Sequence, residues 1–342
     1  MDLSRFTDFP SFPLAELHAH LAPSINPAVY WRIAHDAGVK LPKREFRAFL
    51  EYVTLSPEKK MTMREYFDEI YHPLLDKLSS GVPALEKATY EIMSGAYRGS
   101  IDILELRCNP MKHNREGEQD LDHIIMAMIR GMERAFLEYP QLSAGLLFCM
   151  DRQFSYEKNE IIVEKAIKYH KRGVVGIDLA NYDTGMFHFE DYQKLFEKAR
   201  LAGLKITIHS GETDDTNDIW QALEFAHPER VGHGIKAAYD KKLMSKLSQE
   251  KVVLEVCPLS NLMTKAVENL EEMKFILRTF VENNVIFTIN TDWPEMIEGA
   301  HLWRQFQMLR DEKILTEEEL MQCNQTAHKT TFAPLGGLNA YL

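Results

Sequence analysis

The feature that most constrains this chain is a regular alternation of eight short apolar runs with longer amphipathic segments. The runs are rich in leucine and β-branched residues, as buried strands are, and they cover residues 14–18, 101–108, 143–150, 174–179, 205–209, 230–233, 252–257 and 285–290. Helical spacing follows in segments such as 121–137, 192–202 and 273–282. Eight βα units are the number that closes a parallel barrel. The sequence therefore predicts the α/β class and a (β/α)8 TIM barrel.

The length of 342 residues suits one large barrel with insertions. No linker, low-complexity tract or internal repeat divides the chain. We therefore predict a single barrel domain over residues 1–342. The interval 26–99 is too long for one crossover after the first strand, and Tyr66, Phe67, Ile70 and Leu74 recur in it at helical spacing. We interpret this interval as an inserted helical region that acts as a lid.

Charge and composition exclude several classes of partner. The chain has 40 basic and 51 acidic residues and a net charge of −11, which argues against a nucleic-acid or anionic-membrane binder. We find neither a membrane-spanning apolar run nor the apolar segment of a secretory signal. The four cysteines form no CxxC pair, which favours buried thiols in a reducing compartment. We therefore expect a cytoplasmic protein with no nucleic-acid or membrane partner.

Histidines and an aspartate gather at the predicted carboxyl ends of the strands, where barrel active sites lie. His18 and His20 end the first strand, and residues two apart on a strand point to the same side, so both rings can reach one metal ion. His209 ends the fifth strand, His233 ends the sixth, and Asp292 follows the eighth. One such residue alone is more often structural, but their joint occurrence at one end of the barrel favours a metal site.

Nitrogen and oxygen ligands of this kind suit zinc with an open position for water. The missing CxxC excludes the deaminases that bind zinc through an HxE and PCxxC signature. Residues 176–181 at the end of the fourth strand contain no lysine that could bridge two metals, so we predict one ion per chain. No GxSxG, P-loop or GxGxxG segment follows a strand, which leaves acyl-serine, nucleotide-hydrolysing and dinucleotide-binding functions without support.

Six segments together carry a family resemblance over nearly the whole chain. They are Glu16-Leu17-His18-Ala19-His20-Leu21, Gly176-Ile177-Asp178-Leu179-Ala180, His209-Ser210-Gly211-Glu212, Gly232-His233-Gly234, Glu255-Val256-Cys257-Pro258 and Asn290-Thr291-Asp292. In their order and approximate spacing they resemble the adenosine deaminase family of the amidohydrolase superfamily. A set of this kind is far more specific than any single motif.

The resemblance implies one zinc ion held by four ligands and two further catalytic residues. The ligands would be His18, His20, His209 and Asp292. Zinc lowers the pKa of a bound water toward about 7, so that hydroxide can attack purine C6. Glu212 would protonate ring nitrogen N1, and His233, with Asp292, would orient the hydroxide or take its proton.

Three positions depart from the family pattern, and all three concern the substrate. Ala22 stands where an aspartate usually contacts the ribose 5′-hydroxyl, and Asn181 replaces a glycine whose backbone approaches purine N3. Trp293 replaces a second aspartate that meets N7. The segment 257–262 also resembles the branches that act on adenine and on N6-methylated AMP. Catalysis is therefore more firmly indicated than the identity of the substrate.

We expect zinc-dependent deamination of adenosine or 2′-deoxyadenosine to the inosine product, with a small-molecule purine as the partner. The closest alternative is a related purine, either adenine or a nucleoside or nucleotide altered at its 5′ or N6 position. A catalytically silent purine-binding barrel is the alternative from another class. It would be marked by the loss of Glu212 or of a zinc ligand, and the sequence retains them all.

Overall fold

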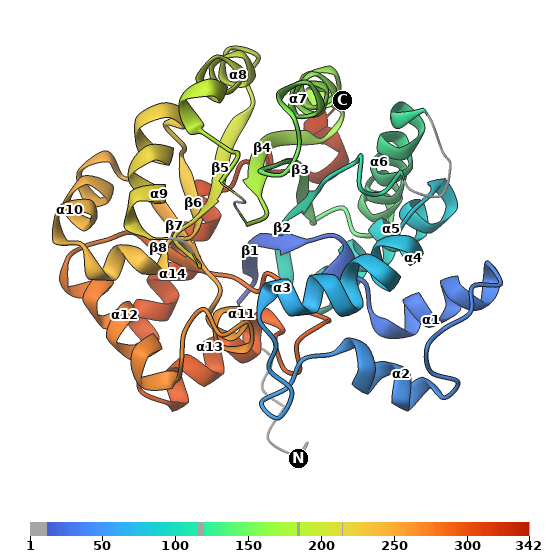
Figure 1. Cartoon of the computed structure of the whole chain (residues 1–342), viewed down its shortest axis with the longest axis horizontal. Helices are drawn as coiled ribbons and strands as arrows, with labels where there is room; N and C mark the ends of the chain where they lie inside the picture. Colours follow the sequence, from blue (N-terminus) through green and yellow to red (C-terminus); the bar gives the residue numbers. More distant parts are fainter. Residues whose placement is uncertain (1–11, 115–119, 183–184, 214, 342) are drawn as a thin grey trace.

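A computed structural model describes residues 12–114, 120–182, 185–213 and 215–341. Eight parallel strands follow one another around a barrel in the order of the sequence, and Figure 1 shows helices surrounding them. The strands are β1 (Leu14–His20), β2 (Ile101–Cys108), β3 (Ser143–Asp151), β4 (Val174–Ala180), β5 (Lys205–Ser210), β6 (Arg230–His233), β7 (Val253–Val256) and β8 (Phe287–Ile289). The predicted (β/α)8 barrel is confirmed.

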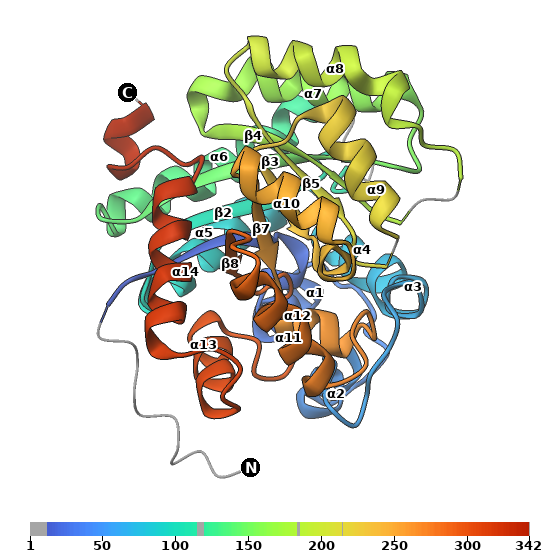
Figure 2. The same ribbon diagram turned by 90° about the vertical axis from the view of Figure 1, so that its left-hand side faces the viewer.

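The helices form an outer ring and a group of shorter elements between β1 and β2 (Figures 1 and 2). The ring contains α5 (Val82–Arg98), α6 (Leu121–Glu138), α7 (Tyr156–Tyr169), α8 (Phe189–Leu201), α9 (Thr216–Gln221), α10 (Lys241–Glu250), α12 (Leu270–Glu282), α13 (Leu302–Asp311) and α14 (Glu317–Thr330). Short 3-10 and π segments are η2 (Ala22–Ser24), η4 (His170–Arg172), η5 (Ala222–Ala226), η6 (Ile235–Tyr239) and η7 (Gly337–Tyr341), and the short helix α11 (Pro258–Met263) follows β7. None of the helices in the described ranges is long and apolar enough to cross a membrane.

The connection from β1 to β2 holds the helices α1 (Pro27–Asp36), α2 (Phe46–Val53), α3 (Met63–Tyr66) and α4 (Asp76–Leu78), with the π-helix η3 (Phe67–Leu75) between the last two. In Figure 1, α3 crosses in front of the strands. Helix α5 instead belongs to the ring, because it packs on α6 so closely that a Cβ on Gly131 would lie 2.5 Å from the Glu86 carbonyl oxygen. A segment that covers the barrel mouth therefore comes from the part of this connection before α5.

The barrel closes at a seam between β8 and β1. A single isolated bridge, between Ala19 and Asp292, joins these strands in the part of the chain that the structure describes. There the Asp292 amide donates to the His18 carbonyl at 2.7 Å, and the His20 amide donates to the Asp292 carbonyl at 3.0 Å. A buried carboxylate supports the seam, because Glu16 accepts from the amides of His18 at 2.8 Å and Thr291 at 3.0 Å. The seam thus lies where three of the four predicted metal ligands lie.

Candidate active site

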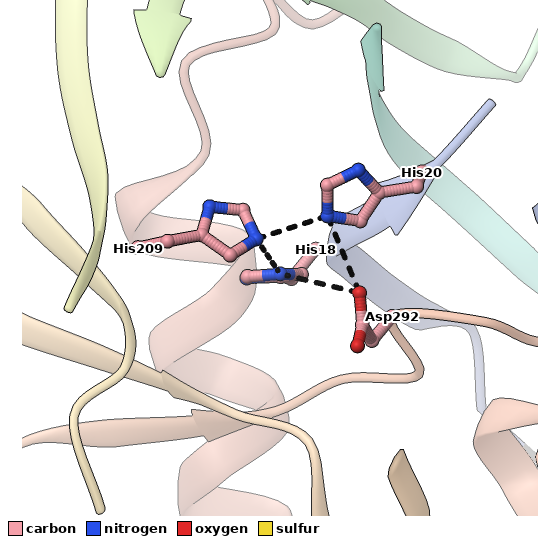
Figure 3. Close-up of side chains that lie close together, drawn as sticks. All are labelled: His18, His20, His209 and Asp292. Carbon is pink, nitrogen blue, oxygen red and sulfur yellow. Dashed lines mark hydrogen bonds and ion pairs between the residues drawn. The ribbon is translucent and has the colours of Figure 1, made fainter. Parts of the chain in front are cut away.

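Four side chains from β1, β5 and the end of β8 converge at the barrel mouth, as Figure 3 shows. His209 Nε2 lies 3.1 Å from His18 Nε2 and 2.9 Å from His20 Nε2. Asp292 Oδ1 lies 3.6 Å from His18 Nε2 and 3.3 Å from His20 Nε2. The four atoms therefore occupy the corners of one small polyhedron.

The spacing of these four atoms fits one metal ion. Ligands at about 2.0–2.1 Å from one zinc ion lie about 3–4 Å from one another. Four of the separations in this set span 2.9 to 3.6 Å, and all ligand atoms lie within 4.8 Å of one another. Asp292 Oδ1 is buried and has no hydrogen-bond partner among the described residues. A buried acceptor of this kind is costly unless something satisfies it. A divalent cation would satisfy this oxygen and the three ring nitrogens together.

Two buried carboxylates hold the opposite nitrogens of two of these rings. Glu255 Oε2 lies 2.8 Å from His18 Nδ1, and Asp178 Oδ2 lies 2.9 Å from His209 Nδ1. Carboxylates in this position keep the Nε2 lone pair directed at a metal. The Arg107 guanidinium joins the two carboxylates, at 3.1 Å from Asp178 and 2.8 Å from Glu255. Burial opposes ionisation of both carboxyls, but Arg107 and their other cationic neighbours outweigh it and lower both pKa values.

Glu212 and His233 lie beside the four converging residues. His233 Nε2 is 3.6 Å from Glu212 Oε2, and both side chains are buried. Burial raises the pKa of the Glu212 carboxyl and lowers the pKa of His233 to about 4. Burial therefore disfavours the charged form of both groups. This pairing can donate a proton to a base and hold an oxygen nucleophile nearby.

Sequence reasoning missed two residues of α11 that touch this group. Ser260 donates to Asp292 Oδ2 at 2.6 Å. Asn261 places its amide nitrogen 3.0 Å from His233 Nδ1 and 3.4 Å from Glu212 Oε1. Both residues belong to the segment 257–262. The resemblance of this segment to other deaminase branches concerned only the choice of substrate. The position of that segment directly after the seventh strand was the available signal, because such positions face the barrel mouth.

One cavity contains Glu212, His233, Asp292 and all three positions that depart from the family pattern. Ala22 lies in η2 and is buried, and Trp293 follows Asp292 directly. The Trp293 ring packs against Tyr66 and Phe67, at centroid distances of 4.9 and 5.7 Å. The segment before α5 therefore contacts the barrel through aromatic rings and contributes Phe67 to the cavity wall.

The backbone explains how an asparagine can stand in place of glycine at position 181. Asn181 has a φ of 76°, in the left-handed region that asparagine tolerates better than most residues. Its side chain forms two hydrogen bonds within the protein. It donates to Asp151 Oδ1 at 3.1 Å and accepts from the Tyr182 amide at 2.9 Å. His233 and Asp292 also have positive φ values, 61° and 62°. Such strain concentrates at functional sites.

Comparison with known proteins agrees with this geometry. The family model described as adenosine deaminase matches residues 13–340. The chain belongs to the adenosine deaminase family. An adenosine deaminase from Shewanella denitrificans is 28% identical over 326 residues, which cover 94% of this chain and 95% of that relative. The predicted resemblance is confirmed, and the chain is a hydrolytic deaminase of adenosine or a related purine.

Solved structures share the fold of this adenosine deaminase family member. An adenine deaminase from Arthrobacter aurescens has a TM-score of 0.84 at 22% identity, with 95% of each chain covered. An amidohydrolase from Burkholderia ambifaria with bound Zn has a TM-score of 0.81 at 19% identity, covering 94% of this chain and 86% of that one. The N6-methyl-AMP deaminase from Arabidopsis thaliana has a TM-score of 0.75 at 23% identity, with 95% and 93% covered. At these identities the likeness establishes the fold alone.

Proposed function

We propose that this protein is a zinc-dependent deaminase that converts adenosine or 2′-deoxyadenosine to the inosine product and ammonia. The observation that carries the proposal is the convergence of three Nε2 atoms and one carboxylate oxygen beside the buried carboxyl of Glu212. His18, His20, His209 and Asp292 would hold one zinc ion per chain. When bound, zinc supplies a water acidic enough to act as a nucleophile near neutral pH. The Burkholderia ambifaria relative with bound Zn supports this choice of metal.

The chain's own residues then divide the proton transfers. Glu212, whose pKa is raised by burial, would donate a proton to purine N1 as C6 becomes tetrahedral. His233 orients the attacking oxygen, and Asp292 is placed to accept its proton. That proton then passes to the amino group on C6, which leaves as ammonia when the C6–N bond breaks. Ser260 holds the second oxygen of Asp292, so that one oxygen stays free to face the metal. The segment before α5, closed over the cavity by Tyr66 and Phe67, excludes bulk water as a lid.

A panel of purines tests the proposal. The zinc-loaded protein is incubated with adenine, adenosine, 2′-deoxyadenosine, 5′-methylthioadenosine, AMP and N6-methyl-AMP, and ammonia release is followed. We expect the highest kcat/KM with adenosine or 2′-deoxyadenosine. Faster turnover of adenine, of N6-methyl-AMP or of a 5′-modified nucleoside would identify that related purine as the substrate instead. The departures at Ala22, Asn181 and Trp293 are compatible with such a substrate. Binding of a purine without ammonia release would identify a silent barrel.

The surroundings of Ala22 lead to a prediction about the 5′ end of the substrate. Ala22 offers no carboxylate, and its neighbours on the cavity wall include the apolar side chains of Pro23, Met63 and Phe67. A site built to hydrogen-bond a hydroxyl rejects analogues that lack it by about 10⁴-fold or more, whereas an apolar site discriminates weakly. We expect kcat/KM for 5′-deoxyadenosine to lie within about tenfold of that for adenosine. A much larger penalty in steady-state kinetics would contradict this.

Trp293 leads to a prediction about purine N7. The indole Nε1–H is a permanent donor and N7 is an acceptor, so Trp293 can serve the role of the usual aspartate. Trp293→Phe keeps the packing on Tyr66 and Phe67 but leaves N7 unpaired, which costs about 1–3 kcal/mol. We expect kcat/KM for adenosine to fall accordingly, while 7-deazaadenosine is much less affected.

The matched control is Trp220→Phe, because the Trp220 indole donates to Asp240 at 3.0 Å and is not among the residues that line the cavity. This control should leave both substrates unchanged. Equal losses for adenosine and 7-deazaadenosine in Trp293→Phe would show that Trp293 acts through shape or stacking instead.

A further inference from the structure

Asn261 lies between the two groups that handle protons, yet it is not among the residues that line the substrate cavity. It belongs to α11 and is completely buried. Its backbone is held at both ends, since its amide donates to the Cys257 carbonyl at 2.9 Å and its carbonyl accepts from Val267 at 2.9 Å. These two hydrogen bonds fix the position of the Asn261 backbone. From there the side-chain amide contacts both His233 and Glu212.

The amide nitrogen of Asn261 can only donate hydrogen bonds. It donates to His233 Nδ1 at 3.0 Å, so this ring nitrogen carries a lone pair. A neutral imidazole has a single N–H, and the proton of His233 therefore sits on Nε2. The same nitrogen lies 3.4 Å from Glu212 Oε1, which makes that oxygen an acceptor. The proton of a neutral Glu212 is thereby left to Oε2.

The side-chain amide of Asn261 is oriented with its nitrogen toward Glu212 and His233. Reversing it would bring the Asn261 oxygen against Glu212 Oε1 and His233 Nδ1, and both would then need a proton at those atoms. As the side chain stands, its oxygen Oδ1 is buried without a hydrogen-bond partner among the described residues.

We propose that Asn261 is a positioning residue that sets where the protons of His233 and Glu212 reside. It holds His233 in the Nε2–H tautomer and directs the Glu212 proton to Oε2. His233 then acts as a donor toward the attacking oxygen, and Asp292 is left as the acceptor of its proton. This inference rests on the proposed deaminase function, and it adds a division of labour between His233 and Asp292.

Substitution of Asn261 by aspartate tests the proposal with almost no change in size. The carboxylate accepts where the amide donated, so His233 should move its proton to Nδ1. We expect kcat for adenosine to fall by about tenfold or more, toward the loss that follows when a general acid or base is removed. The KM should stay within about twofold and the zinc content should not change, because Asn261 contacts neither the cavity nor the four ligand atoms. Asn261→Ser, which is smaller and uncharged, should behave in the same direction.

Nitrogen-15 NMR of the histidine rings shows which ring nitrogen of His233 carries the proton. A purely structural role of Asn261 would not predict a change in this tautomer. We expect His233 with a protonated Nε2 in the unchanged protein and a protonated Nδ1 in Asn261→Asp. The control is Asn324→Asp in α14, a buried asparagine that bonds to the backbone of Ala15 and Pro13 instead. It should lower the Tm and leave the His233 spectrum and kcat unchanged.

A proton on Nδ1 of His233 in the unchanged protein would overturn the inference, whether or not any variant folds. An unchanged kcat in a folded Asn261→Asp or Asn261→Ser protein would do the same. If the unchanged protein deaminates none of the purines, the proposed function fails, while the tautomer still decides the role of Asn261.

Discussion

Replacing Glu212 by glutamine should lower turnover of adenosine by about 10²-fold or more, the scale on which general acid–base catalysis contributes. Glutamine keeps the shape of the side chain and its contact with Asn261, but it has no carboxyl proton to deliver. The zinc content and the Tm should remain close to those of the unchanged protein. Steady-state kinetics, metal analysis and thermal unfolding check the three quantities separately.

The pH profile gives a second test of the same residue. Burial raises the pKa of Glu212, so the acid form persists to higher pH than for an exposed glutamate. Activity that needs this acid form is present below the raised pKa and is lost as the pH rises through it. The residual activity of Glu212→Gln should lack this alkaline decline. Glu224→Gln, on the exposed surface of η5, is the matched control and should change neither rate nor profile. Near-normal turnover in a folded, zinc-loaded Glu212→Gln protein would leave Glu212 as a structural carboxylate.

Replacing His209 by alanine should remove metal and activity together. His209 Nε2 lies within 3.1 Å of both other ligand nitrogens, so its loss removes one of the three imidazoles that would hold the ion. We expect about one zinc ion in the unchanged protein, the stoichiometry of a three-histidine, one-carboxylate catalytic site. Elemental analysis should find the variant metal-free after dialysis, and ammonia release should fall below detection.

The control for this prediction is His123→Ala, since His123 lies exposed on α6 away from the cavity. It should retain both metal and turnover. A metal-free preparation of the unchanged protein that still deaminates adenosine would contradict the proposed role of the metal.

Much of the barrel could be predicted because strands and turns leave local signals. The predicted strands 101–108 and 230–233 have the observed bounds of β2 and β6. The seventh and eighth strands are shorter than predicted, at Val253–Val256 and Phe287–Ile289. Backbone hydrogen bonds from Leu254 to Ile286 and from Asn290 to Val256 continue just beyond the bounds of β8. The helical spacing of Phe67, Ile70 and Leu74 predicts a helix here, but not its π form. The π-helix η3 contains Pro73, a residue that ordinarily breaks a helix.

Some residues of the candidate site could likewise be predicted from the sequence, and others could not. The converging histidines could be placed because each one ends a strand, and strand ends of a barrel meet at one face. The partners of those histidines could not. Asp178 and Glu255 stood out in sequence only as parts of short motifs, and it takes the register of four strands to bring them to His209 and His18. The contacts of Asn261 were even harder to predict. This residue lies in a helix of six residues and contacts Glu212 and His233, which come from other parts of the chain.

Because the metal site lies at the seam between β8 and β1, a bound metal would also stabilise the fold. An ion held by His18, His20 and Asp292 would tie the first strand to the last, across a loop that includes most of the polypeptide. Such a tie resembles a reversible cross-link, because the ligands come together only in the folded chain. Binding free energy then adds to folding free energy, and the gain grows with the logarithm of free metal concentration. The supply of metal would therefore govern how long the enzyme survives proteolysis as well as how fast it works.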